Sequence, residues 1–195
     1  MWLPEWGQSD RFLRETMFGP EHPRKHGRDG LAPPPDCLDT SLPGFGPFGT
    51  AGRHCFDEAN PVYMRIAAAC QARKRYPVLR YGRQYLRPIA EFEDFRDASA
   101  GEFAAWSRIL DDEEALCVVN TNGREERGAR VLVDADLNPP DSAMTVVLNT
   151  AQAAGGGGSH QVGEALPVER TADGKAYVEI HSLPASEALV LMNHP

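Results

Sequence analysis

Several features that would assign a function at once are missing from this sequence. Its 195 residues include only 4 cysteines, Cys37, Cys55, Cys70 and Cys117, and no two of them form a CxxC pair. Zinc sites and disulfide frameworks need regularly spaced cysteines, so we expect neither, and the thiols are predicted to be reduced and structural. No apolar run approaches the roughly 20 residues of a membrane helix, so no membrane partner is expected.

A targeting segment is also missing. The N-terminal stretch MWLPEWGQSDRFLRE lacks the basic start and the apolar core of a signal peptide, which predicts a cytoplasmic location. Hydrophobic residues make up 42% of the chain, enough to bury one good core and a second small one.

Acidic residues are missing from residues 72–88, ARKRYPVLRYGRQYLRP, where Arg and Lys are interleaved with tyrosines. The whole chain nevertheless carries 28 Asp+Glu against 20 Lys+Arg, a formal net charge of −8. Binding to phosphates sums over an entire patch, and the acidic run EFEDFRD follows directly, so no nucleic-acid partner is expected. These arginines are predicted either to stay solvated or to pair with carboxylates elsewhere in the fold, while the tyrosines pack.

The chain begins with a loop zone and one helix. Residues 1–58 are rich in Gly and Pro and predict a long loop, with one short helix at SDRFLRETMF. Asn60 and Pro61 are good first residues of a helix, which Pro77 ends. Apolar residues at helical spacing give this helix a face that needs a partner, either the rest of the fold or a second copy of the chain: Val62, Ile66, Ala69 and Cys70.

Short strands are predicted from Leu79 onward. EFAAWSRIL and EALCVVNT flank an acidic turn and predict a hairpin, and the continuous apolar run of its second strand predicts a central, doubly buried position. Further runs with turn signals between them predict an antiparallel β-sandwich of six to eight strands. Its apolar strand faces are expected at Cys117, Val119, Val131, Val133, Val146, Leu148, Val178, Ile180, Leu189 and Leu191.

Candidate chemistry is sparse, and no catalytic, cofactor-binding or metal-binding residue is predicted. Four carboxylates, Asp111 to Glu114, are expected to form a solvated turn, and Asp134 and Asp136 an exposed strand face. Four consecutive glycines in AQAAGGGGSH lack the lysine of a phosphate loop. The histidines and serines show neither ligand spacing nor a nucleophile elbow: His22, His26, His54, His160, His181, His194, Ser107 and Ser159.

Two longer stretches carry a resemblance to a known family. GFGPFGTAGRHCFDEANPVYMRIAAACQARKRYPVLRYGRQYLRPI, followed by AWSRILDDEEALCVVNTNG, resembles the C-terminal end of α-amylase superfamily glycoside hydrolases. In that family the last helix of a (β/α)₈ barrel leads into an antiparallel β domain. The resemblance implies a loop-rich barrel remnant at residues 1–58, the last barrel helix at 59–77 and a C-terminal β-sandwich at 78–195.

The resemblance also implies what this chain lacks. A complete barrel takes about 250 residues, and too few precede Asn60 to hold the family's catalytic acids. The chain is therefore expected to be a truncated C-terminal fragment, inactive alone, that stabilises the barrel and borders the sugar cleft of an enzyme acting on α-glucans or oligosaccharides. Two alternatives stay open: a carbohydrate-binding module that uses tryptophans (Trp2, Trp6 and Trp106), or a purely structural domain.

Overall fold

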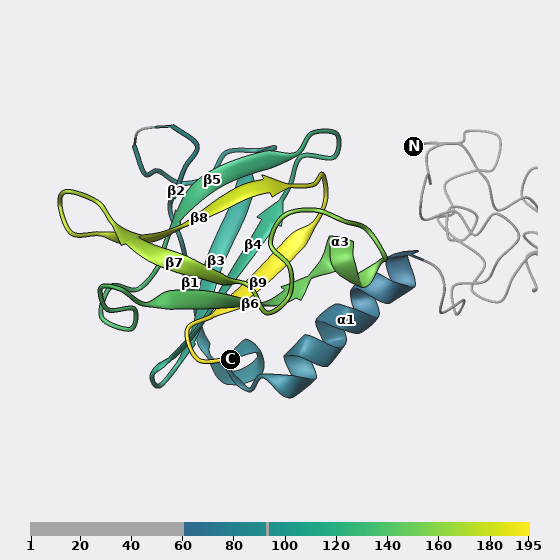
Figure 1. Ribbon diagram of the computed structural model, residues 1–195, viewed down its shortest axis with the longest axis horizontal. Helices are drawn as coiled ribbons and strands as arrows, with labels where there is room; N and C mark the ends of the chain where they lie inside the picture. The colour runs from purple at the N-terminus through teal and green to yellow at the C-terminus, as the bar shows by residue number, and fades with distance from the viewer. Residues whose placement is uncertain (1–60, 93) are drawn as a thin grey trace, which may run out of the picture. The chain divides into compact units, whose positions relative to one another are not determined.

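The computed structural model describes residues 61–92 and 94–195 (Figure 1). The chain divides into two compact units at the boundary between Met64 and Arg65, so the second unit is described almost completely. Several sequence predictions lie outside the described residues, namely the loop zone 1–58, its short helix and the helix cap at Asn60.

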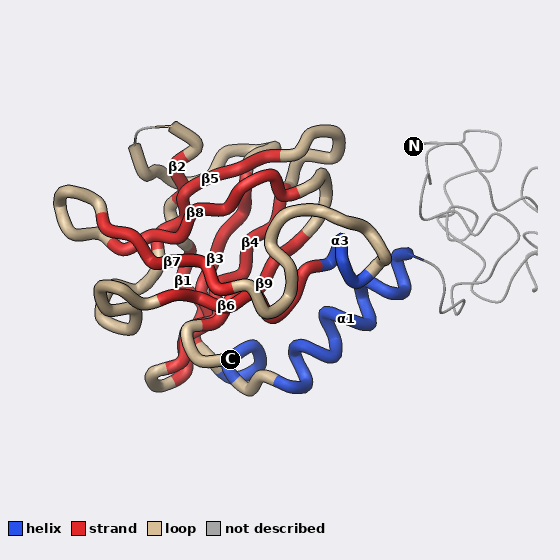
Figure 2. Tube along the Cα trace, viewed as in Figure 1, coloured by secondary structure: helices blue, strands red, loops and turns tan. Residues whose placement is uncertain are grey.

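Nine strands and three helices make up the described part of the chain (Figure 2). In chain order they are α1 Pro61–Arg75, α2 Val78–Tyr81, β1 Arg83–Leu86, β2 Ile89–Ala90, β3 Phe103–Leu110, β4 Glu113–Asn120, β5 Arg127–Leu132, β6 Ala143–Asn149, α3 Thr150–Ala153, β7 Ala165–Arg170, β8 Ala176–Leu183 and β9 Ala188–Met192.

The strands pair in the order β1-β3-β4-β9-β6-β7-β8-β5-β2, and every pairing is antiparallel. Because β7 pairs with both β6 and β8, it joins two half-sheets that fold over each other (Figure 1). We call β1, β3, β4, β9 and β6 the first half-sheet, and β8, β5 and β2 the second. One apolar core lies between them and includes Phe103, Leu116, Met144, Val178 and Leu189. The predicted antiparallel β-sandwich is confirmed.

The hairpin predicted around the acidic turn is β3 and β4. The two strands pair from Phe103 with Asn120 to Leu110 with Glu113, and Asp111 and Asp112 form the turn. The prediction that β4 is central is also confirmed, because β4 lies between β3 and β9 and its residues 114–118 are all buried.

A second, outer cluster lies on the other side of the first half-sheet and includes Cys117, Leu148, Val190 and Met192. The expectation that Leu148 shares a face with Val146 is wrong. The register of β6 against β9 shifts between these two residues, so Val146 points into the inner core and Leu148 into the outer cluster. The face predicted for β4 was likewise the outer one: Leu116 and Val118 fill the inner core, Cys117 faces outward and Val119 is half-exposed.

Helix α1 covers the outer cluster and ends at Arg75, before Pro77 as predicted. It packs through Ala68 and Ala72, and Tyr76, the residue after the helix, continues the same row of residues four apart. The face predicted to need a partner does not pack on the sandwich, since Ile66 is 59% exposed and Ala69 and Cys70 are also exposed; its pairing with a second copy stays a prediction.

Candidate functional site

The four carboxylates of the β3–β4 turn do not behave alike. Asp111 and Asp112 are exposed, as expected for a solvated turn. Glu114 is fully buried, so the expectation is wrong for this residue. Its place at the start of β4, opposite the chain segment that follows β9, removes it from water, and its main-chain N–H donates to Asn193 Oδ1 at 2.8 Å.

Glu114 is the centre of a buried polar cluster at one end of the sandwich. Arg87 Nη2 donates to Glu114 Oε1 at 2.7 Å, and Asn138 Nδ2 donates to Oε2 at 2.6 Å. Ser107 Oγ and the main-chain N–H of Asp134 donate to the same carboxylate. The carboxylate charge is therefore paired and hydrogen-bonded, as a charge out of water requires. The cluster fastens the segment after β5 to the first half-sheet.

A second buried carboxylate, Glu187, lies at the opposite end of the same strands. Arg65 Nε on α1 donates to Glu187 Oε1 at 3.0 Å and to Oε2 at 3.1 Å, and Arg65 Nη2 also donates to Oε1. The hydroxyl of Thr150, at the start of α3, donates to the same carboxylate. The hydrogen bond to Glu187 raises the pKa of Arg65 above its already high ordinary value. This contact attaches α1 to the sandwich.

The two carboxylates occupy equivalent places in a repeated pattern. Residues 114–120 read EALCVVN and residues 187–193 read EALVLMN. They form β4 and β9, which pair antiparallel at the centre of the first half-sheet. Each Glu therefore faces the Asn that ends the other stretch: Asn193 N donates to Glu114 O at 3.2 Å, and Asn120 N to Glu187 O at 3.0 Å. The repeat E-A-L-x-x-x-N is the signal that sequence reasoning missed.

The remaining candidate residues have structural places. Asp134 and Asp136 follow β5 instead of sharing a strand face, and Asp134 Oδ1 accepts from the N–H of Asp136 at 3.1 Å. His160 is buried and its Nε2 accepts from the main-chain N–H of His181 at 2.8 Å. Burial lowers the pKa of His160. Ser107 lies in the Glu114 cluster, and Ser159 presents its carbonyl to Asn149 Nδ2.

These arrangements do not make a catalytic centre. Glu114 is out of contact with solvent, so it cannot reach a sugar, and Ser107 is hydrogen-bonded to a carboxylate and an arginine instead of to a general base. Residues 61–92 and 94–195 contain no cluster of His, Cys, Asp and Glu that could hold a metal ion. Within the same ranges no helix is long and apolar enough to cross a membrane.

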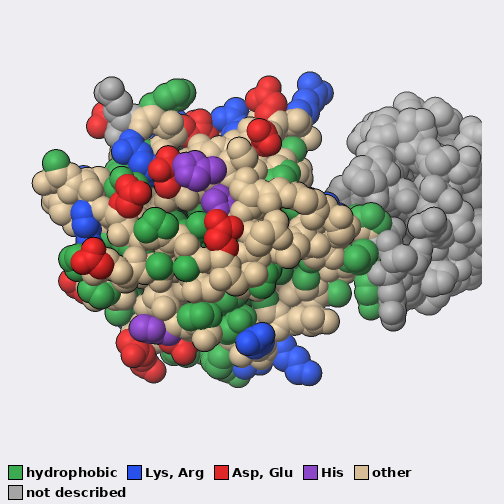
Figure 3. All heavy atoms as spheres, in the orientation of Figure 1, with side chains coloured by type: hydrophobic (Ala, Val, Ile, Leu, Met, Phe, Trp, Pro, Cys, Tyr) green, Lys and Arg blue, Asp and Glu red, His purple; other side chains and the backbone are tan. Residues whose placement is uncertain are grey.

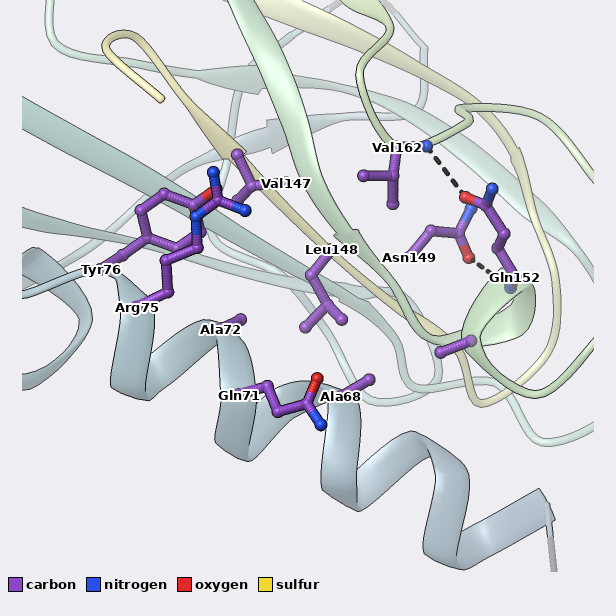
Figure 4. A pocket seen from close by; sticks show the side chains of 11 residues that line it. Ala68, Gln71, Ala72, Arg75, Tyr76, Val147, Leu148, Asn149, Gln152 and Val162 are labelled. Atoms are coloured by element: carbon purple, nitrogen blue, oxygen red, sulfur yellow. Dashed lines mark hydrogen bonds between the residues drawn. The ribbon is translucent and has the colours of Figure 1, made fainter. Parts of the chain in front are cut away.

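The seam between α1 and the sandwich contains a hollow of about 290 Å³ (Figure 4). Ala68, Gln71 and Ala72 of α1 form one wall, and Leu148 of β6 faces them. On the far side, Gln152 links two segments, since its N–H donates to Asn149 and its Oε1 accepts from the N–H of Val162 at 2.9 Å. The alanines of α1 fill the seam incompletely.

A second hollow of about 380 Å³ is lined by Ala69, Ala72 and Arg73 of α1 together with Trp106, Cys117 and Val190 of the sheet. Trp106 is half-buried here, on the outer side of the first half-sheet and not between the half-sheets. Cys117 is buried and burial raises its pKa to about 12, so its thiol is inert. Trp2 and Trp6, the other tryptophans considered for sugar binding, lie outside the described residues.

A third hollow, of about 480 Å³, lies over the second half-sheet near Phe95 and Tyr177. The two rings are tilted, with centroids 5.8 Å apart, and the Arg130 guanidinium lies 5.5 Å and 5.6 Å from their centroids. The guanidinium thus occupies the ring faces that a sugar would stack on. This hollow gives no support to a carbohydrate platform.

No protein-family model and no curated protein matches the sequence. Among solved structures, the described fold is similar to AmyP in complex with maltose, with 12% identity and a TM-score of 0.42 over 74% of this chain and 22% of that one. It is similar to CldA, a cyclomaltodextrin glucanotransferase, with 17% identity and a TM-score of 0.45 over 76% of this chain and 25% of that one. It is also similar to an α-amylase from H. orenii, with 14% identity and a TM-score of 0.39 over 70% of this chain and 21% of that one.

This chain thus spans about a fifth to a quarter of the length of these solved proteins.

Proposed function

We propose that this chain is the C-terminal part of an α-amylase-like glycoside hydrolase, with α1 as the last helix of a barrel and the sandwich as the domain that holds it. Residues 59–77 would form that helix and residues 78–195 the sandwich, with residues 1–58 bordering the sugar cleft. The catalytic acids would lie in the rest of the whole enzyme, whose substrate would be an α-glucan or an oligosaccharide.

The observation that carries the proposal is the way α1 is held. The helix is attached by Arg65 to Glu187 and by a thin row of alanines, with a hollow on either side. Its opposite side presents Ile66 at 59% exposure. A helix with a polar attachment on one side and an exposed aliphatic residue on the other is expected to have a second apolar neighbour, as a barrel helix does.

An activity assay of the purified chain tests the proposal that the catalytic acids lie outside it. We expect no turnover of starch, maltooligosaccharides or sucrose, because hydrolysis needs an acid and a nucleophile that reach one anomeric carbon. Asp111 and Asp112 are the exposed carboxylates of the acidic turn and serve as probes. Turnover that is abolished by Asp111→Asn or Asp112→Asn would contradict the proposal.

Light scattering at increasing concentration tests the open side of α1. Without a barrel, this side should draw copies of the chain together, and Ile66→Asp should reduce the association. Ala98→Asp, in the exposed segment between β2 and β3, adds the same single negative charge and is the matched control. A chain that stays monomeric at all concentrations, with α1 amides fully protected from exchange, would show that this helix needs no second neighbour.

The carbohydrate-binding alternative rests on Trp106, which lines the hollow of about 380 Å³ beside α1. Calorimetry with maltoheptaose distinguishes the two proposals. Binding that Trp106→Leu abolishes would favour the carbohydrate-binding module. If no heat of binding is measured at millimolar sugar, the proposal that the sandwich holds α1 is favoured.

A further inference from the structure

Residues 61–90 contain seven Lys and Arg residues and no Asp or Glu. Two of the seven are neutralised by the buried carboxylates, since Arg65 pairs with Glu187 and Arg87 with Glu114. Of the other five, Arg75 lines the hollow next to β6, and four lie at the C-terminal end of α1, on α2 and at the start of β1, with Arg108 of β3 beside them. We call the following set the basic edge: Arg73, Lys74, Arg80, Arg83 and Arg108.

The charges of the basic edge are not compensated locally. In the described part of the chain no carboxylate oxygen lies within 4.0 Å of their nitrogen atoms, so of the predicted stretch only Arg87 pairs with a carboxylate. They are held instead by neutral groups. Arg73 Nη1 donates to Leu79 O at 3.1 Å and Arg108 Nη2 to Arg80 O at 3.2 Å, while the Arg80 guanidinium lies 5.2 Å from the Tyr81 ring centre.

Apolar side chains are exposed among these charges. Tyr81 is 70% exposed, Leu86 78% and Tyr85 43%. On the face shown in Figure 3 acidic and basic side chains are interspersed, and Lys and Arg lie at the right of its lower rim, near the place of the C-terminal end of α1 in Figure 1. Exposed aromatic and aliphatic groups together with arginine are the composition of binding surfaces.

Among the described residues, strand β1 is also a sheet edge that no other strand pairs with on its outer side. It is the last strand of the first half-sheet, and all four of its residues are exposed. The N–H of Arg87, one residue past β1, donates to Ala105 O at 2.9 Å, so residues 83, 85 and 87 direct their main-chain groups toward β3. The main-chain N–H and C=O of Gln84 and Leu86 therefore point outward, as in a sheet that is able to accept another strand.

We propose that β1 and the basic edge bind an acidic polypeptide segment in extended conformation, which adds to the sheet beside β1. The outward groups of Gln84 and Leu86 supply the main-chain hydrogen bonds, the exposed Tyr85 and Leu86 contact its apolar side chains, and the basic edge pairs with its carboxylates. Pairing of β1 with β1 of a second copy would bring two basic edges together, which like charges oppose. A nucleic acid cannot add to a sheet as a strand, and the chain as a whole is acidic, so both observations favour a polypeptide over a nucleic acid.

The test uses the full chain and a labelled synthetic peptide of about eight residues that alternates Glu and Val, the length of an ordinary strand. Fluorescence anisotropy should show saturable binding that weakens with added salt. The double variant Arg80→Glu/Arg83→Glu should bind about tenfold more weakly. Arg124→Glu, in an exposed turn between β4 and β5, is the matched control and should bind as the unmodified chain does.

Gln84→Pro separates strand addition from attraction of charge alone. Proline removes the outward N–H but keeps every charge, and an edge strand tolerates it. We expect peptide binding to be lost in this variant, with an unchanged circular dichroism spectrum. Peptide binding that survives Gln84→Pro would overturn the proposal. So would a single-stranded DNA oligonucleotide that binds more tightly than the peptide, or no binding of the peptide at low salt.

Discussion

Replacing Arg87 by methionine is expected to destabilise the sandwich strongly. The substitution keeps most of the side chain's volume and removes the cation next to Glu114. The Glu114 side chain is 0% exposed and that of Arg87 15%, so the pair is nearly dry. Removing one partner of a buried ion pair leaves an uncompensated charge, which costs about 3 to 5 kcal/mol.

The structure places the expected cost at the lower end of that range. Ser107, Asn138 and the N–H of Asp134 still donate to the carboxylate after Arg87 is removed. The free energy of unfolding should fall by about 3 kcal/mol, out of the roughly 5 to 15 kcal/mol of an ordinary domain. The unfolding temperature should fall by about 10 °C.

Urea unfolding followed by circular dichroism measures this change. Arg124→Met is the matched control, because Arg124 is exposed and pairs with no carboxylate in the described ranges, and it should change the free energy of unfolding by less than about 0.5 kcal/mol. Adding Glu114→Gln to Arg87→Met removes the unpaired buried charge of Glu114 and should restore part of the lost free energy of unfolding. The coupling energy between the two substitutions should be about 1 kcal/mol or more. Equal unfolding midpoints for Arg87→Met and Arg124→Met would refute the reasoning.

Three further changes probe other parts of the sandwich. Burial holds the pKa of His160 below its ordinary value, so between about pH 6.5 and that lower pKa the unfolded chain binds a proton at this residue and the folded chain does not. The free energy of unfolding, measured by urea titration, should therefore fall as the pH drops through this window, and it should fall less in His160→Gln. In a Cys37→Ser/Cys55→Ser variant, the exposed Cys70 should react with a thiol reagent at once and Cys117 only on unfolding; rapid reaction of both would be inconsistent with a buried β4. Gly82→Ala should cost about 1 to 3 kcal/mol, since a Cβ there would lie 2.6 Å from Val78 O of α2 and 2.9 Å from Ile109 O of β3; an unchanged melting temperature would refute this close approach of residue 82 to β3.

The parts of the fold that the sequence predicted are those with strong local patterns. The β3–β4 hairpin combines apolar strands with an acidic turn, and α1 has a proline near each end. Strand β2 has two residues and β1 is exposed throughout, so neither shows a period. The bulge at Val147 turns the side chain of Leu148 from the inner core to the outer cluster, and no residue pattern in the sequence indicates it.

The polar contacts could not be predicted for a different reason. Arg65 and Glu187 are 122 residues apart in the chain, and only the assembled sheet brings them together. Whether a carboxylate can be buried depends on partners that are distant in the sequence. The sequence around Glu114 therefore gave no reason to separate it from the exposed Asp111 and Asp112 of the same turn. The repeat E-A-L-x-x-x-N marks both buried acids, but it gives no hint of the arginine that each one receives.

The antiparallel pairing of the two EALxxxN stretches gives one pair of strands two unequal ends. At the Glu114 end the arginine side chain is 15% exposed, whereas at the Glu187 end it is 34% exposed. Water can therefore reach the Arg65 contact and replace it, while β4 and β9 stay paired. Helix α1 should open as a separate unit at a fraction of the free energy that unfolds the sheet, so its amides exchange early and those of β4 and β9 last. Strands β4 and β9 thus form the most stable part of the sandwich and also hold a helix that can detach from it.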